Sequence, residues 1–183
     1  NAGSYDRIDK AASQNEFSSQ WNHWAFTKNC SSGEMKMYLN GVLWHSGNNK
    51  TAPIDIQEIK LGSNGKGTGY FWDGKIKELR IFNKELDNIT INNWMNIRMN
   101  ATHPDYSNLV AHYPLNEGIG SSANDNSPNN QVAIFNGNVL WESTRGEHIS
   151  QFFSPTNFRP HINIFQGDYS TTTTTITVLD SLL

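Results

Sequence analysis

The polar side chains best suited to binding a metal ion gather in one stretch, ANDNSPNN, which spans residues 123–130. Asp125, Asn126 and Ser127 offer carboxylate, amide and hydroxyl oxygens, and the loop adds backbone carbonyls. Ca²⁺ prefers about six to eight such oxygens. The sequence therefore makes these three residues a candidate calcium site. The alternative is an Asx-turn loop without an ion, because Asn, Asp, Ser and Pro are also the ordinary residues of turns.

Aromatic side chains beside polar loops form the second candidate site, because carbohydrate sites combine apolar rings with a few polar groups. Tyr70, Phe71 and Trp72 follow the glycine-rich stretch NGKGTG and are candidates for ligand binding. Tyr38 and His45 are further candidates, on the wetter face of a predicted hairpin. The alternative for each ring is packing in the interior. Four other aromatic residues are expected to lie in the core: Trp24, Phe26, Trp44 and Trp94.

The sequence contains no recognisable catalytic motif. Its six histidines lack the H-x-H and H-x-x-x-H spacings of metal ligands, and no serine lies in a G-x-S-x-G motif. Glu78 and Arg80 alternate on one predicted strand, which favours a cross-strand ion pair over catalysis. Cys30 is the single cysteine, so it forms no internal disulfide; a small turn residue is favoured over a reactive thiol. We therefore expect no enzymatic activity in this segment.

The elements that would position these residues begin with a hairpin in MKMYLNGVLWHSG, residues 35–47. Asn40-Gly41 suits a tight turn, because both central residues of a type I′ turn need positive φ. Leu39 should then lie opposite Val42, and Met37 opposite Trp44. One face, predicted to be dry, contains Met35, Met37, Leu39, Val42 and Trp44. The other, predicted to be mostly wet, contains Lys36, Tyr38, Leu43 and His45.

The rest of the chain also favours strands. Residues 20–28 alternate, and a break is expected between 54–56 and 59–61, where the apolar positions change parity. The stretch 70–83 should be a strand that is buried on both faces or bent at Gly74. Residues 84–99 contain the one expected helix, with Asp87 as its N-cap. Further strands are expected at 109–118 and around Asn136-Gly137, and the threonine-rich tail is either a strand or a linker.

Composition excludes two classes of partner. The 183-residue chain has a formal net charge of −3, which gives no attraction to nucleic acid or to an anionic membrane. No run approaches the roughly 18 apolar residues of a membrane span, so we expect no membrane insertion. Aromatic residues make up 11% of the chain, which suits a β-sandwich core or a sugar-binding surface.

Four segments occur in an order that resembles a known family: WNHWAFTKN, MKMYLNGVLWHSG, IKLGS and FWDGKIKELRIFNKEL. Together they resemble the C-terminal half of laminin-G-like domains in the concanavalin A-like lectin/glucanase superfamily. The stretch LVAHYPLNEGIGSSANDNSPNN through GNVLWES resembles the beginning of such a domain, although the family's usual next strand, F-D-G-x-D-D-Y-V, is missing. The resemblance implies an all-β jelly-roll sandwich with one short helix, followed by part of a second β unit.

The resemblance also implies how the chain is divided. Residues 1–100 would be the C-terminal part of one laminin-G-like sandwich, 101–108 a linker, and 109–183 the start of a second β-rich domain. The first unit would lack its opening strands, so its last strand would be an exposed edge. We therefore expect residues upstream of Asn1 in the full protein.

For function, the resemblance implies a non-catalytic ligand-binding or adhesion module that recognises a glycan or a protein ligand. It would be secreted or at the cell surface, in an exported bacterial protein, beside other domains of the same polypeptide. The family often binds calcium through the Asp of the D-x-S loop. The paired carboxylates of its glucanases, an E-x-D-x-E strand, are missing, and Lys77 stands where an Asp often follows the Ile. Two alternatives are an accessory domain of a secreted glycan-processing or proteolytic enzyme, and a structural spacer in a repetitive adhesin.

Overall fold

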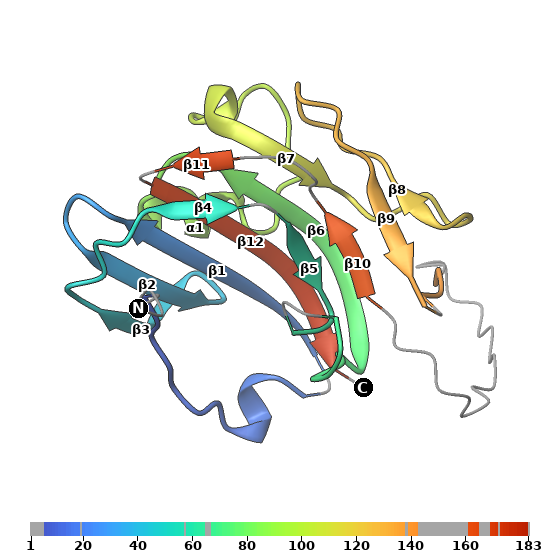
Figure 1. The fold of residues 1–183 in the computed structure, drawn as a ribbon, viewed down its shortest axis with the longest axis horizontal. Helices are drawn as coiled ribbons and strands as arrows, with labels where there is room; N and C mark the ends of the chain where they lie inside the picture. Colours follow the sequence, from blue (N-terminus) through green and yellow to red (C-terminus); the bar gives the residue numbers. More distant parts are fainter. Residues whose placement is uncertain are drawn as a thin grey trace.

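The computed structural model describes residues 6–18, 20–56, 58–64, 67–137 and 139–142, and the backbone of three strands between residues 161 and 182. Its largest sheet has the strand order β3-β2-β1-β12-β6-β7, and all neighbours are antiparallel (Figure 1). The bounds of these strands are β1 (Trp21–Asn29), β2 (Glu34–Leu39), β3 (Val42–Gly47), β6 (Gly74–Phe82), β7 (Leu109–Tyr113) and β12 (Thr173–Leu182).

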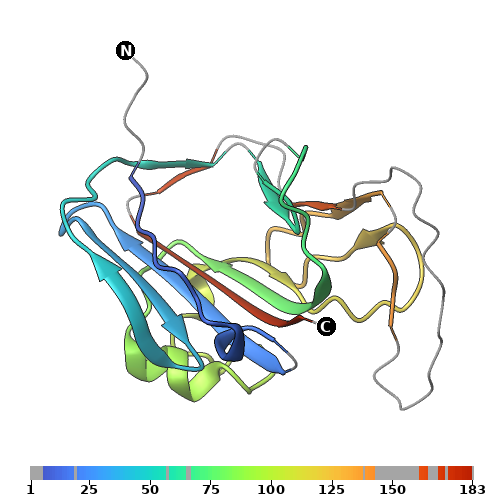
Figure 2. The same cartoon turned by 90° about the horizontal axis from the view of Figure 1, so that it is seen from below.

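Two smaller sheets lie on one side of the six-stranded sheet (Figure 2). One has the order β5-β10-β9-β8, and the other pairs β11 with β4. Their bounds are β4 (Ile54–Ile56), β5 (Ile59–Leu61), β8 (Ser122–Ala123), β9 (Ala133–Asn136), β10 (His161–Ile164) and β11 (Tyr169–Thr171). Helix α1 (Asn88–Trp94) lies on the opposite side, and short 3₁₀ turns occur at Gln14–Glu16 and Tyr106–Asn108. The predicted all-β sandwich with one short helix is confirmed.

The sheet does not follow the predicted division of the chain at residues 101–108. Strand β7 pairs with β6, and β12 lies between β1 and β6, so strands from both predicted parts share one sheet. Because β6 is paired on both sides, the predicted exposed edge is wrong. The expected linker is also packed: His103 is buried and contacts the rings of Phe82 and Trp94.

Each face of the six-stranded sheet has its own core. The face toward α1 buries Phe82, Ala25 and Tyr38 against residues that follow β6 along the chain: Leu86, Ile91, Met99 and Leu109. The face toward the small sheets buries Leu79, Ile81, Ala111 and Tyr113 against Ala123, Ala133 and Phe135. The C-terminal half of β6 is therefore buried on both faces, as one of the two predictions for it stated.

Helix α1 begins and ends where side chains satisfy its backbone. Asp87 caps the N-terminus, as predicted, and accepts a hydrogen bond from the Thr90 N–H at 2.7 Å. At the other end, the buried Arg80 guanidinium donates to the Trp94 carbonyl at 2.9 Å and to the Ile97 carbonyl at 2.7 Å. The helix is too short to be stable alone, so these contacts fix its position on the sheet.

The hairpin of β2 and β3 forms at Asn40-Gly41, where both residues have positive φ, 50° and 78°. Leu39 lies opposite Val42, as predicted. A register shift beyond Tyr38 then places His45, rather than Trp44, opposite Met37. Tyr38 keeps its predicted partner Leu43, so the shift does not move it to another face. The predicted dry and wet faces are nevertheless wrong, because Tyr38 is buried on the α1 side while Val42 is 69% exposed. A bulge of this kind leaves little trace in a two-residue alternation.

Three further predictions from the sequence concern strand positions, and the structure agrees with them to different degrees. The break between 54–56 and 59–61 is confirmed, since β4 and β5 belong to different sheets. The threonine-rich tail forms strand β12 rather than a linker. The first strand predicted around Asn136-Gly137 is formed as β9, and the described residues that follow, 139–142, have no regular secondary structure.

Candidate functional site

The predicted calcium loop binds to the edge of β7. Oδ1 of Asp125 accepts hydrogen bonds from the N–H groups of His112 and Ser127, both at 2.8 Å. Oδ2 accepts from the Ser127 hydroxyl at 2.8 Å and from the Gln131 N–H at 3.0 Å. Asn129 donates to the Val110 carbonyl at 2.7 Å. The loop therefore satisfies backbone groups that an edge strand would otherwise leave unpaired.

This geometry does not fit a calcium ion. Both oxygens of the buried Asp125 carboxylate already accept from N–H or O–H donors, so they offer no free lone pairs in the directions a cation would need. The Asn126 side chain is on the exposed side of the loop. Among the described residues, no three His, Cys, Asp or Glu side chains cluster in a way that would hold a metal. The arrangement matches the Asx-turn alternative.

The predicted aromatic loop presents one of its three rings to solvent. Tyr70 is 92% exposed and has a φ of +54°, in the left-handed region that non-glycine residues rarely adopt. The loop is pinned on both sides of it, by Trp72 N–H to the Gly62 carbonyl at 2.9 Å and by Asn64 N–H to the Gly69 carbonyl at 2.9 Å. Phe71 and Trp72 are half-buried.

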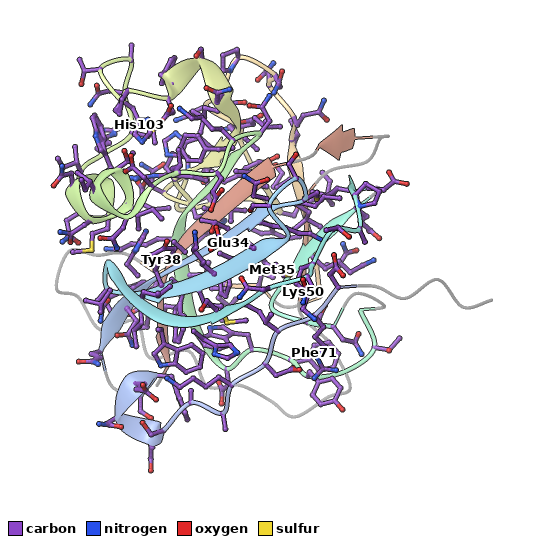
Figure 3. The ribbon with its side chains drawn as sticks, turned by 90° about the vertical axis from the view of Figure 1, so that its left-hand side faces the viewer. Glu34, Met35, Tyr38, Lys50, Phe71 and His103 are labelled. Atoms are coloured by element: carbon purple, nitrogen blue, oxygen red, sulfur yellow. The ribbon has the colours of Figure 1, made fainter. Side chains whose placement is uncertain are left out.

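Tyr38 and His45 do not join that loop. Tyr38 is 5% exposed and faces α1, where burial raises the pKa of its hydroxyl. In Figure 3 Tyr38 lies on the hairpin, near Glu34 and Met35, and Phe71 lies well away from it. His45 is on the other face of the hairpin, and its ring contacts Trp44 at 6.3 Å. The five predicted ligand-binding residues therefore do not form one site.

A different aromatic cluster lies on the face of β1, β2 and β3 that points toward the small sheets. Trp24 and Phe26 have nearly parallel rings, 8° apart, with centroids separated by 6.2 Å. Trp44 packs edge-on against Trp24 at 5.2 Å. Phe26 is 38% exposed, and Trp24 and Trp44 are only partly buried. We call Trp24, Phe26 and Trp44 the aromatic face.

The register of the sheet explains why the aromatic face is open. Phe26 and Ile81 both lie opposite Ile176 of β12, so they occupy one row on the same side of the sheet. At the β6 end of that row, Ile81 is 1% exposed beneath the four-stranded sheet. At the β1 end of the row, Phe26 is 38% exposed and does not belong to that core. The same surface is thus core at one end and accessible at the other.

Residues 6–18 pass over part of the aromatic face, and we call them the N-terminal strap. Asp6 forms a largely buried ion pair with Lys28 at 2.7 Å and accepts from the Ala52 N–H at 2.8 Å. Lys10 lies over the Trp44 ring, 4.2 Å from its centroid, and donates to the Trp44 carbonyl at 3.0 Å. Glu16 accepts from the Trp44 indole N–H at 2.6 Å.

Hydrogen bonds hold Glu16 in its charged form. Its carboxylate accepts from the N–H and hydroxyl of Ser13, both at 2.7 Å, as well as from Trp44. These donors, Ser13 first, lower the pKa of Glu16 to about 2. The strap therefore places a fixed carboxylate and an ammonium group beside one indole ring.

A buried polar cluster on the opposite face is too small to bind a ligand. It surrounds a cavity of about 10 Å³, enough for about one water molecule, next to His23, Arg80 and His103. Arg80 also pairs with Glu78 at 3.0 Å, within one strand rather than across strands as predicted, and His112 of β7 contacts the same carboxylate oxygen at 3.2 Å. This cluster joins β6, β7 and α1.

The sequence of this chain matches the model of one known protein family. The model of the concanavalin A-like lectin/glucanases superfamily, of the laminin-G type, matches residues 1–92, half of the chain. The chain belongs to this family. No curated protein and no solved structure matches it significantly. The predicted family is confirmed.

Membership in the laminin-G-like family indicates a ligand-binding or adhesion module of a kind that is typically extracellular. In the described part of the chain, no helix has the length and apolar character needed to cross a membrane. The matched residues include all of β1, β2 and β3, and therefore the whole aromatic face.

Sequence reasoning missed this laminin-G-like aromatic face because it treated Trp24, Phe26 and Trp44 as core. Their alternation on strands is the same as that of core residues, and what distinguishes them is that the core on this side of the sheet does not include them. The i, i+2 spacing of Trp24 and Phe26 was the available sign, since it places two large rings side by side on one face.

Proposed function

We propose that this laminin-G-like chain is a non-catalytic module that binds glycans on its aromatic face. The observation that supports the proposal is the exposure of Phe26 in a sheet row whose other end is buried core. An exposed aromatic side chain in a contiguous apolar patch marks a binding surface more often than chance. Its neighbours Trp24 and Trp44 extend the aromatic surface beyond Phe26.

The chemistry of the face suits a sugar. The apolar C–H side of a pyranose packs on aromatic rings, and polar groups at the edge then fix its orientation. His45 next to Trp44, and the charged groups of Lys10 and Glu16, are the polar groups at this edge. Trp24, Phe26 and Trp44 come from paired strands of one sheet, so the surface is rigid before a ligand arrives.

A glycan array and pull-down on insoluble polysaccharides tests the proposal. We expect the wild-type protein to retain at least one class of glycan, and Phe26→Ala to lose most of that binding. Leu43→Ala is the matched control, because Leu43 is also an exposed apolar residue of the hairpin but lies opposite Tyr38, on the other face. Equal binding by wild type and Phe26→Ala, or no glycan bound at all, would contradict the proposal.

Tyr70 supports a second candidate site, on the loop that the sequence predicted. A ring that is 92% exposed at a strained backbone position is held there by its loop, which suits an anchor for a protein or glycan ligand. Tyr70→Ala in the same array separates the two sites: loss of binding in this variant alone would favour the loop over the aromatic face.

A further inference from the structure

Trp44 and Glu16 together present three groups that attract a cation. The π face of Trp44 takes the Lys10 ammonium at 4.2 Å, and its backbone carbonyl accepts from the same nitrogen at 3.0 Å. Glu16, whose carboxylate accepts from the indole N–H at 2.6 Å, supplies a negative charge at the ring's edge. The π face and the carbonyl meet at the Lys10 ammonium, and the carboxylate adds a negative charge at the indole N–H edge of the same ring. Together they form a receptor for a primary ammonium group.

This receptor does not depend on Lys10 for its shape. Trp44 is held by its contact with Trp24 and by its hydrogen bond to Glu16. Glu16 is held in turn by the N–H and hydroxyl of Ser13, in the capping box of the 3₁₀ turn. If the Lys10 side chain swings away, the ring, the carbonyl and the carboxylate all stay in place. The site is therefore formed in advance of any ligand that replaces Lys10.

Lys10 itself is a weakly held occupant. It is exposed, it has a long and flexible side chain, and its ordering over the ring costs conformational entropy. The strap has stronger attachments elsewhere, in the Asp6–Lys28 pair and in the packing of Ile8 on Gly47. Lys10 can therefore leave the ring while the rest of the strap keeps its position.

From these contacts the geometry points to an ammonium subsite, formed by Trp44 and Glu16 and filled by Lys10 in the free protein, that selects glycans carrying an unacetylated amino sugar. This inference rests on the proposed glycan binding and adds the class of ligand. A sugar ring on Trp24 and Phe26 would place its neighbour beside Trp44, and a protonated amine on that neighbour would take the position of the Lys10 ammonium. N-acetylation removes the charge and so removes the preference.

Titration calorimetry with two oligosaccharides of equal length, one of glucosamine and one of N-acetylglucosamine, tests the subsite. Lys10→Ala frees the receptor, so we expect it to tighten binding of the glucosamine oligomer by about two- to fivefold, the size of an exposed cation–π contact. The acetylated oligomer should bind the variant and the wild type equally. Adding Glu16→Gln to Lys10→Ala should remove the gain.

Lys75→Ala is the matched control for charge, because Lys75 is a surface lysine paired with Glu142 at the start of β6. It should leave both affinities unchanged. The inference is overturned if Lys75→Ala tightens binding as much as Lys10→Ala, if Lys10→Ala acts equally on both oligomers, or if Glu16→Gln has no effect.

The same experiment separates this inference from the proposed function. The glycan site stands if Phe26→Ala abolishes binding of the acetylated oligomer or of a neutral glycan. The ammonium subsite is then refuted if Lys10→Ala does not tighten binding of the glucosamine oligomer relative to the acetylated one. If no glycan binds in a Phe26-dependent manner, the proposed function fails and the subsite fails with it.

Discussion

Phe26 on β1 and Ile81 on β6 lie on the same face of one sheet, each directly opposite Ile176 of β12, yet Phe26 is 38% exposed and Ile81 is 1% exposed. Ile81 packs in the core with Ala133 and Phe135 of β9, whereas Phe26 is not part of that core. One row of the sheet therefore holds a core position on β6 and a partly exposed position on β1.

This difference in exposure predicts that truncating Ile81 and truncating Phe26 to alanine lower the free energy of unfolding by different amounts. Ile81→Ala removes a fully buried side chain and should destabilise the protein by about 2–5 kcal/mol. Phe26→Ala removes a partly solvated ring from the same row and should cost less than about 2 kcal/mol. Urea denaturation of both variants measures the two values. Equal losses would mean that Phe26 belongs to the core and that the aromatic face is not a free surface.

The Asp125 loop should act as a structural cap of β7. Asp125→Ala leaves the buried His112 N–H without its acceptor and removes three further hydrogen bonds, so we expect a loss of about 2–3 kcal/mol in the free energy of unfolding. Asn126→Ala, at the exposed neighbouring position, should change it by less than about 0.5 kcal/mol.

The same loop predicts the response to calcium. Because its carboxylate oxygens are already occupied, millimolar Ca²⁺ should leave the melting temperature of the wild-type protein unchanged. A rise in melting temperature with Ca²⁺ that Asp125→Ala abolishes would show instead that the loop rearranges around the ion, since a ligand that binds the native state stabilises it.

Arg80 should control the position of α1. Arg80→Lys keeps the charge but loses the geometry that reaches the Trp94 and Ile97 carbonyls and Glu78 together, so we expect a loss of about 2–4 kcal/mol. Arg98→Lys is the control, because Arg98 is exposed. The α1 amides should exchange hydrogen faster in Arg80→Lys than in the wild type, and at the wild-type rate in Arg98→Lys. Unchanged exchange in Arg80→Lys would show that Arg80 does not hold α1 in position.

His23 should make stability depend on pH in the acid range. Burial first, and the nearby Arg80 charge second, lower the pKa of His23 from 6.5 to about 4. Between these values the unfolded chain binds a proton that the folded chain does not, so His23 contributes a loss of stability as pH falls from about 6.5 to 4. Its size is at most about 3 kcal/mol. Denaturation midpoints across this range should depend less on pH in His23→Gln than in the wild type, and an unchanged pH dependence in the variant would contradict the assignment to His23.

The sequence predicted those parts of the fold that depend on local pattern. The Asn40-Gly41 turn, the Asp87 cap and the parity change between Ile56 and Ile59 all follow from neighbouring residues, and each is formed. The insertion of β12 between β1 and β6 is different. It joins residues about 150 positions apart on the β1 side and about 100 apart on the β6 side, and it leaves no local trace in a threonine-rich strand.

The candidate site was harder to predict than the fold. The exposed Tyr70 followed from its glycine-rich loop, but Tyr38 was expected on a wet face and is buried, because residues that follow β6, among them Ile91 of α1, pack on that face. Asp125 was predicted as a calcium ligand, with an Asx-turn as the alternative, and its role at the β7 edge depends on tertiary contacts that the local sequence does not reveal. The partial exposure of Phe26 depends on which residues pack over β1, and the i, i+2 spacing of Trp24 and Phe26 indicates only that the two rings share a face.

Nuclear magnetic resonance of the tryptophan indole N–H groups, with and without a glycan identified on the array, tests the aromatic face most directly. The protein has six tryptophans, of which Trp24 and Trp44 belong to that face and Trp72 to the Tyr70 loop. We predict that the Trp24 and Trp44 signals shift on saturation with the glycan and that the Trp72 signal does not. A shift of Trp72 alone, or unchanged Trp24 and Trp44 signals with a bound glycan, would contradict the account.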